Sequence, residues 1–170
     1  MVSGPIGSHG TAIMAAREGI AFEAAIESDA ATLFPLVELL RHAAGASVHV
    51  LRDPTRGGLA SALNEIAAAS GVGVVLEDGA LPVHGPVASV CDLLGLDVMY
   101  VANEGVLVAF VEADAAEAAL AAPRSHPLGA EAVIAGTVVV DHPGMVVLRT
   151  GLGGTRIVDM LPGDQRPRIC

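Results

Sequence analysis

The sequence contains no tryptophan, one tyrosine and three phenylalanines, and all nine of its basic residues are arginine. So few aromatic rings leave little on which nucleobases could stack. Nineteen acidic residues bring the net charge to -10, which opposes binding to nucleic acid and to anionic membrane surfaces. We therefore expect neither nucleic acid nor a membrane among the partners.

Long hydrophobic runs are also missing, although 52% of the residues are apolar and the mean hydropathy is +0.59. No run approaches the roughly 18 residues that span a bilayer. The opening MVSGPIGSHG has neither the basic flank nor the apolar core of a signal peptide. A cytoplasmic protein is expected, and 170 residues suit one domain or one half of a larger protein.

Only two cysteines occur, too few for a disulfide framework. The six histidines form no HxxxH pair and no CxxC motif accompanies them, so we expect no metal site within this chain. Cys91 lies among apolar residues at helical spacing, which predicts a buried thiol. Cys170 is the last residue, where a thiol is reachable and open to oxidation, and this position suggests a use.

Alternating periodicities predict helices interleaved with strands, followed by a run of strands. Helices are expected over 8–19, 28–45, 58–71, 84–97 and 113–122, and strands over 47–51, 72–78, 97–102, 105–112, 132–140, 144–150 and 154–161. The second helix begins at Ser28 and Asp29 with a kink at Pro35, or Pro35 marks its true beginning. The pattern predicts a layered α/β or α+β fold, with a mixed sheet and helices packed against it.

The stretch RDPTRGGL places Asp53, Thr55 and Arg56 in a loop before a helix that opens with Gly57 and Gly58. Helix starts expose unpaired N–H groups, and a glycine pair lets the backbone approach a phosphate. The alternative is that Asp53 and Thr55 only cap the helix. The stretch lacks the lysine and spacing of a P-loop.

The stretch ANEG places Asn103 and Glu104 between two apolar segments. A carboxylate fixed by rigid neighbours and partly shielded from water suits a general base. A plain hairpin turn of Asn, Glu and Gly between two strands explains the same residues without any function.

The last twelve residues, 159–170, contain two prolines and one glycine, which favours an extended, mobile segment. Fully stretched, they reach on the order of 40 Å. Cys170 could therefore enter a site elsewhere on the protein or on a partner.

Together, GPIGSHGTAIMAARE, DPTRGGLASALNEIA, ANEG and the terminal PRIC resemble the family of hydrogenase maturation factors called HypE. That family is part of the superfamily of aminoimidazole ribonucleotide synthetase, selenophosphate synthetase and thiamine monophosphate kinase. Its members are about twice as long as this chain. The resemblance implies a C-terminal domain over 1–158 and a mobile tail over 159–170, without the N-terminal domain that binds ATP and metal, so we expect a piece of a longer protein.

The resemblance implies an ATP-dependent dehydratase whose substrate is its own tail. The carbamoyltransferase HypF would load Cys170, Glu104 would take a proton from the carbamoyl nitrogen, and ATP with Mg²⁺ would drive dehydration to a thiocyanate. The cyanide would pass to iron on a HypC–HypD scaffold for the nickel-iron hydrogenase centre. The full-length protein would be a homodimer, and this chain alone would be inactive. The residues implied for nucleotide binding are Asp53, Thr55, Arg56, Gly57, Gly58 and Asn103.

Two other functions stay open at this point. The chain could belong to a kinase or synthetase of the same superfamily that acts on a free small molecule, in which case Cys170 would be incidental. It could also be a non-catalytic assembly domain whose apolar sheet face covers a partner.

Overall fold

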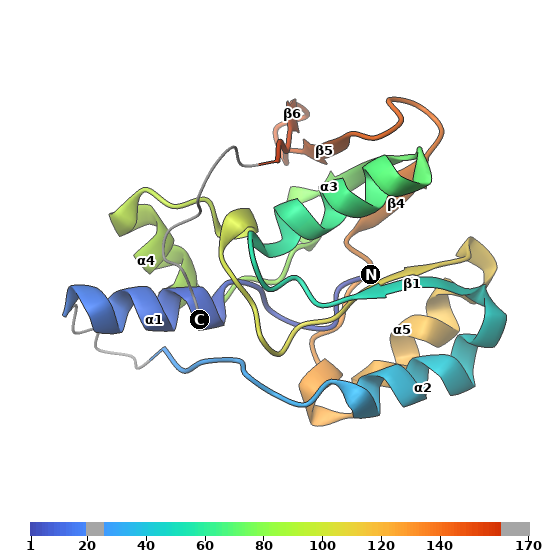
Figure 1. Cartoon of the computed structure of the whole chain (residues 1–170), viewed down its shortest axis with the longest axis horizontal. Helices are drawn as coiled ribbons and strands as arrows, with labels where there is room; N and C mark the ends of the chain where they lie inside the picture. The colour runs from blue at the N-terminus through green and yellow to red at the C-terminus, as the bar shows by residue number, and fades with distance from the viewer. Residues whose placement is uncertain (20–25, 161–170) are drawn as a thin grey trace.

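The computed structural model describes residues 1–19 and 26–160 (Figure 1). The helices are α1 (Ser8–Glu18), α2 (Phe34–Ala44), α3 (Gly58–Ser70), α4 (Gly85–Leu94) and α5 (Ala116–Arg124). The strands are β1 (Val48–Arg52), β2 (Gly73–Glu77), β3 (Val108–Val111), β4 (Gly136–Val139), β5 (Val146–Arg149) and β6 (Thr155–Ile157). A 3-10 turn, η3 (Val98–Tyr100), precedes β3. Within these ranges, no helix has both the length and the apolar character to cross a membrane.

The strands form two sheets. β1 and β3 form an antiparallel pair, and the second sheet has the order β4-β2-β5-β6. In that second sheet β2 and β5 are parallel, whereas the β2–β4 and β5–β6 pairs are antiparallel. Figure 1 shows α2 and α5 side by side along the β1–β3 pair, and α3 beside the four-stranded sheet. The predicted mixed sheet with packed helices is therefore confirmed.

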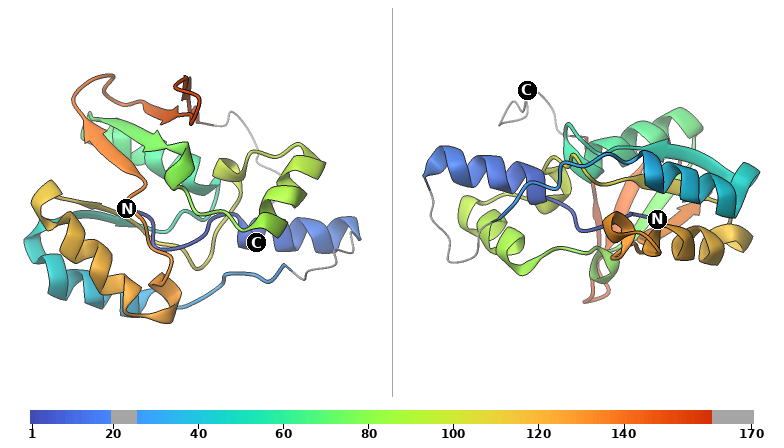
Figure 2. Two further views of the ribbon diagram at one scale, coloured as in Figure 1. Left: turned by 180° about the vertical axis from the view of Figure 1, so that it is seen from behind. Right: turned by 90° about the horizontal axis from the view of Figure 1, so that it is seen from below.

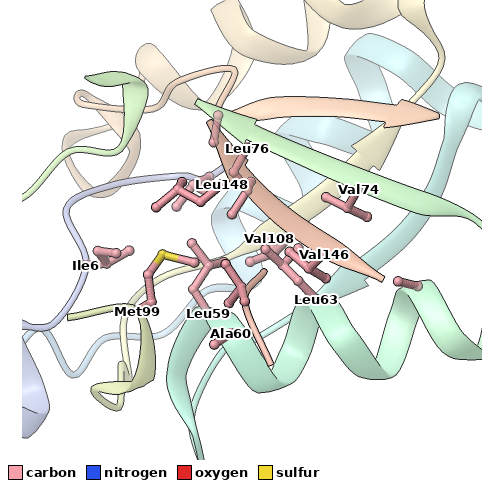
Figure 3. Close-up of a cluster of buried hydrophobic side chains, with 14 of the residues drawn as sticks. Ile6, Leu59, Ala60, Leu63, Val74, Leu76, Met99, Val108, Val146 and Leu148 are labelled. Carbon is pink, nitrogen blue, oxygen red and sulfur yellow. The ribbon is translucent and has the colours of Figure 1, made fainter. Parts of the chain in front are cut away.

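The largest core lies between α3 and the four-stranded sheet (Figure 3). Every second side chain of β2 and β5 faces α3, as the two-residue period of a strand requires. Burying each such side chain stabilises the fold by about 1.5–3 kcal/mol. The central residues are Leu59 and Leu63 of α3, Val74 and Leu76 of β2, and Val146 and Leu148 of β5, each at most 3% exposed.

The start of α2 decides between the two alternatives for the second helix. α2 begins at Phe34, with Pro35 in its first turn, where a missing N–H costs nothing and the fixed φ suits a helix. The prediction that Pro35 marks the beginning is confirmed. The placement of Ser28 and Asp29 at the helix start is wrong, because residues 26–33 have no regular secondary structure.

The strand predicted over 97–102 is also wrong. The side chain of Asp97 accepts a hydrogen bond from the Met99 N–H at 3.0 Å and begins the η3 turn. β3 pairs instead with β1, about sixty residues earlier in the chain, through contacts such as Val50 opposite Phe110. ANEG is therefore not a hairpin turn, and that alternative for Glu104 no longer applies.

The prediction of a buried thiol at Cys91 is confirmed. Cys91 lies on α4, is 3% exposed, and packs with Val87 and Val101. Burial raises the pKa of the Cys91 thiol to about 11, and the negative charges of Asp92 and Asp97 add to the effect. At pH 8 roughly one molecule in a thousand would carry the thiolate.

This environment predicts that Cys91 of the folded chain resists alkylation by iodoacetamide at pH 8, because the thiolate is the reacting form and the sulfur is shielded. Peptide mass spectrometry of the folded chain, with the urea-unfolded chain as the control, measures the reaction. Equal rates of labelling at Cys91 in the two states would contradict the buried, protonated thiol.

Candidate functional site

The site forms where three loops meet at the side chain of Asn103, which is fully buried. Its Oδ1 accepts a hydrogen bond from the Gly7 N–H at 2.7 Å, just before α1. Its Nδ2 donates to the carbonyls of Pro54 and Val101, each at 3.0 Å. Motifs that lie far apart in the sequence, GPIGSHG, DPTRGG and ANEG, are thereby joined at one point.

Figure 2 shows how the helices frame these loops. In both views α1 and α4 lie at one end of the molecule, α2 and α5 lie at the other, and the loops cross between them. Ile6, Leu59 and Val106, which flank the three loops in the chain, are buried in one core cluster, so the backbone around Asn103 is held by packed neighbours.

The glycine pair at the start of α3 allows the backbone of this helix to pack closely against the backbone of residues 99–101. Gly57 and Gly58 both have left-handed backbone conformations, with φ of 74° and 60°, which glycine adopts at little cost. A Cβ atom on Gly58 would lie 2.5 Å from the carbonyl oxygen of Val101 and 2.6 Å from that of Met99. The N-terminus of α3 is therefore pressed against η3 and the ANEG segment.

The polar residues of the same loop lie at the surface. Asp53 and Arg56 are exposed and Thr55 is half-buried, and the Thr55 hydroxyl donates to the Asp53 carboxylate at 3.4 Å. The N-cap position of α3 is Gly57, which has no side chain, so the alternative in which Asp53 and Thr55 cap this helix is wrong. The predicted role of these residues in nucleotide binding stays a prediction.

The role predicted for Asn103 as a nucleotide ligand also stays a prediction. Its amide hydrogen bonds are made to protein backbone groups, so the contacts seen here are those of a residue that fixes the loops.

Glu104, the next residue, is half-buried, and its backbone N–H donates to the Asp29 carboxylate at 3.2 Å. A cavity of about 480 Å³ next to this turn is bordered by residues that include Ser8, Asp29 and Gly105.

Cys170 lies outside the described residues, but the segment from which the tail departs is described. Asn64 of α3 donates to the carbonyl of Val158 at 2.8 Å, and the hydroxyl of Tyr100 in η3 donates to the carbonyl of Asp159 at 2.8 Å. Burial, and then the charge of Asp97, raise the pKa of the Tyr100 phenol, so its hydroxyl remains a donor. The tail therefore begins where α3 contacts η3, the turn that precedes ANEG in the chain.

Sequence reasoning missed three residues that shape this site: Asp29, Asn64 and Tyr100. Asn64 could have been noticed, because asparagine is unfavourable within a helix unless its amide has a partner. Tyr100 is the single tyrosine of the chain, yet its partner is a backbone carbonyl that no sequence pattern marks. Among the residues that the structure describes, no group of three His, Cys, Asp or Glu side chains could hold a metal ion.

Comparison with known proteins defines the class of domain. Residues 1–149 match the family described as AIR synthase related protein, C-terminal domain. A thiamine monophosphate kinase from Aquifex aeolicus shares the fold, with a TM-score of 0.55 at 15% identity over 86% of this chain and 48% of that chain. Residues 1–149 thus form an AIR synthase related C-terminal domain.

Closer relatives narrow the class. The carbamoyl dehydratase HypE of Bradyrhizobium diazoefficiens is 52% identical over all 170 residues of this chain, which cover 49% of the relative. A crystal structure of the hydrogenase maturation protein HypE matches with a TM-score of 0.93 at 45% identity, over 99% of this chain and 54% of that chain. The chain belongs to the HypE family, and it spans about half the length of the curated relatives it matches.

Two further HypE structures were solved with ligands or partners. HypE in complex with ATP matches with a TM-score of 0.92 at 44% identity, over 99% of this chain and 51% of that chain. The HypE–HypF complex matches with a TM-score of 0.88 at 46% identity, over 93% of this chain and 51% of that chain.

The Asn103 contacts predict a large loss of stability in Asn103→Ala, because the variant leaves the Gly7 N–H and the Val101 carbonyl buried without the amide. The Pro54 carbonyl keeps the backbone N–H of residue 103 at 3.3 Å. Each group that loses its partner costs about 1–3 kcal/mol, so the free energy of unfolding should fall by about 2 kcal/mol or more. Asn64→Ala is the matched control, since Asn64 is only half-buried and water can replace its amide, for a loss of about 1 kcal/mol. Urea unfolding measures both, and equal losses would contradict the central role of Asn103.

Proposed function

We propose that this chain is the C-terminal half of a carbamoyl dehydratase that converts a carbamoyl group on its own Cys170 into a thiocyanate. The proposal concerns a protein of the relatives' length, of which this chain spans about half. The observation that carries it is the fixed root of the tail, where Val158 and Asp159 are held by α3 and by η3, the turn that precedes ANEG in the chain.

In this function the tail is both substrate and carrier. The Cys170 thiolate accepts a carbamoyl group from HypF, and the solved HypE–HypF complex of relatives supports that partner. Loading requires an accessible sulfur, whereas dehydration requires a site poor in water. The ten residues that follow Met160 reach roughly 33–36 Å when extended, so the same thiol serves both places from one anchored root.

The conversion removes the elements of water from the thiocarbamate. The carbamoyl group, S–CO–NH₂, loses its oxygen as phosphate and its nitrogen loses two protons, one to Glu104 and the other to the departing phosphate or water, which leaves S–C≡N. Glu104 is the base that takes a proton from the nitrogen, and it follows Asn103, whose side chain fixes the loops around it. The cyanide would then pass to the HypC–HypD scaffold for the iron of a nickel-iron hydrogenase.

ATP, when bound, supplies the phosphoryl group that makes the carbamoyl oxygen a leaving group, and the HypE–ATP complex of relatives supports this cofactor. The groups here that suit phosphate are the α3 N-terminus at Gly57 and Gly58, with Thr55 and Arg56 in the loop before it. The Asp53 carboxylate would face phosphate only through a bound cation. Mg²⁺ and most of the nucleotide would be held by the N-terminal half, which also forms the homodimer. The chain alone would therefore lack activity.

The carrier role predicts opposite effects of the two cysteine substitutions in a full-length protein that carries this domain. Cys170→Ala should abolish carbamoyl loading by HypF and leave the melting temperature unchanged, because a chain end makes few packed contacts. Cys91→Ala should load normally and lose about 1 kcal/mol of stability as a small core truncation. Intact mass after incubation with HypF, carbamoyl phosphate and ATP measures loading. Loss of loading in Cys91→Ala, with normal loading in Cys170→Ala, would show that Cys91 is the carrier and would contradict the proposal.

The base role predicts that Glu104→Gln accepts the carbamoyl group but stops before the thiocyanate, because the amide keeps the shape of the side chain and cannot take the proton. Intact mass separates the two stages, since conversion removes the mass of water. Glu117→Gln is the matched control, because Glu117 is exposed on α5 at the end of the molecule opposite α1 and α4 (Figure 2), and should convert like the wild type. Normal conversion by Glu104→Gln would remove Glu104 from the mechanism.

A further inference from the structure

Asp29 is a polar residue that the mechanism above does not use, and it contacts the turn that carries Glu104. It belongs to the irregular segment 26–33 between α1 and α2. Its Oδ1 accepts the backbone N–H of Glu104 at 3.2 Å, across seventy-five positions of sequence. In the part of the chain that the structure describes, its Oδ2 is buried without a hydrogen-bond partner, so the Glu104 amide is what this carboxylate binds.

A second contact places Asp29 against the same turn. A Cβ atom on Gly105 would overlap the backbone carbonyl oxygen of Asp29 at 1.7 Å, so the residue after Glu104 must be glycine for the two segments to pack. Gly105 and Asp29 both border the cavity of about 480 Å³. The backbone of Glu104 and Gly105 is therefore fixed by the side chain and the main chain of one residue.

The segment around Asp29 is itself tied to α1. The Ser28 hydroxyl lies 2.8 Å from His9 Nδ1 on α1, and Ser28 Oγ also accepts the Ala30 N–H at 3.1 Å. These two contacts close a turn around Asp29 and hold it to a helix. Asp29 thus links the Glu104 backbone to α1 through Ser28. Asn103 links the same turn to the loop before α3 through its hydrogen bond to the Pro54 carbonyl.

We propose that Asp29 is a positioning residue for proton removal: its carboxylate fixes the backbone of Glu104 and so sets where the Glu104 carboxylate lies. This inference rests on the proposed function, in which Glu104 is the base. Misplacing a catalytic group by about 1 Å can cost about a hundredfold in rate. Loading of Cys170 by HypF does not use Glu104, so that step should not depend on Asp29.

Three variants test the proposal in a full-length protein that carries this domain. Asp29→Ala removes the acceptor for the Glu104 N–H, whereas Asp29→Asn keeps it through the amide oxygen. Asp114→Ala removes an exposed aspartate and is the control for lost charge. Carbamoyl loading and the single-turnover conversion to thiocyanate are followed by intact mass. Amide hydrogen exchange at Glu104 reports the positioning itself, independently of activity.

We expect all three variants to load like the wild type. Asp29→Ala should convert at least about tenfold more slowly and its Glu104 amide should exchange roughly tenfold faster or more, while Asp29→Asn and Asp114→Ala stay near the wild type in both measurements. A merely structural role would lower loading and melting temperature together with conversion.

Normal conversion by Asp29→Ala would overturn the proposal, and so would unchanged exchange at Glu104. Slow conversion by Asp29→Asn with a protected Glu104 amide would also overturn it, because positioning would then not be what the carboxylate supplies. A wild-type protein that loads no carbamoyl group would instead overturn the proposed function, and exchange at Glu104 would still decide whether Asp29 holds the turn.

Discussion

The hydrogen bonds of the Asn103 side chain all end on backbone groups, and each of these groups belongs to a different stretch of the loops that meet there. A carboxamide is suited to this role because it offers a donor and an acceptor in one plane without a charge. Burying it is favourable only while every partner is present, so the loops before α1 and before α3 must both be formed for either to be stable. The position of Glu104 depends on that shared constraint.

The anchored root of the tail gives the site a second property. Asn64 and Tyr100 hold Val158 and Asp159 by hydrogen bonds to main-chain carbonyls, which fix the backbone whatever side chains follow. The tail thus starts from a fixed point at η3, the turn that precedes ANEG in the chain. A thiol tethered to a fixed point has a high effective concentration at any site within reach of the tether.

Much of the fold could be predicted because local signals mark it. Pro35 marks the start of α2, and the glycine pair marks the start of α3. The strand expected over 97–102 failed because an apolar run does not show whether an aspartate turns the chain, as Asp97 does. The ANEG motif identified Asn103 and Glu104 as candidate site residues. The roles of Asp29 and of the tail root depend on contacts between residues far apart in sequence, which no single motif records.

The net charge of the chain constrains how the proposed chemistry is divided between this domain and the other half of the protein. A net charge of -10 repels a triphosphate over most of the surface, so phosphate groups are attracted only where local positive charge is focused. In the motif loops this means Arg56 and the N-terminus of α3. We infer that this domain supplies the base and the carrier thiol, and that the other half supplies most of the charge that holds nucleotide. Dehydration would then proceed only when the two halves and the tail meet, which keeps the activated oxygen away from water.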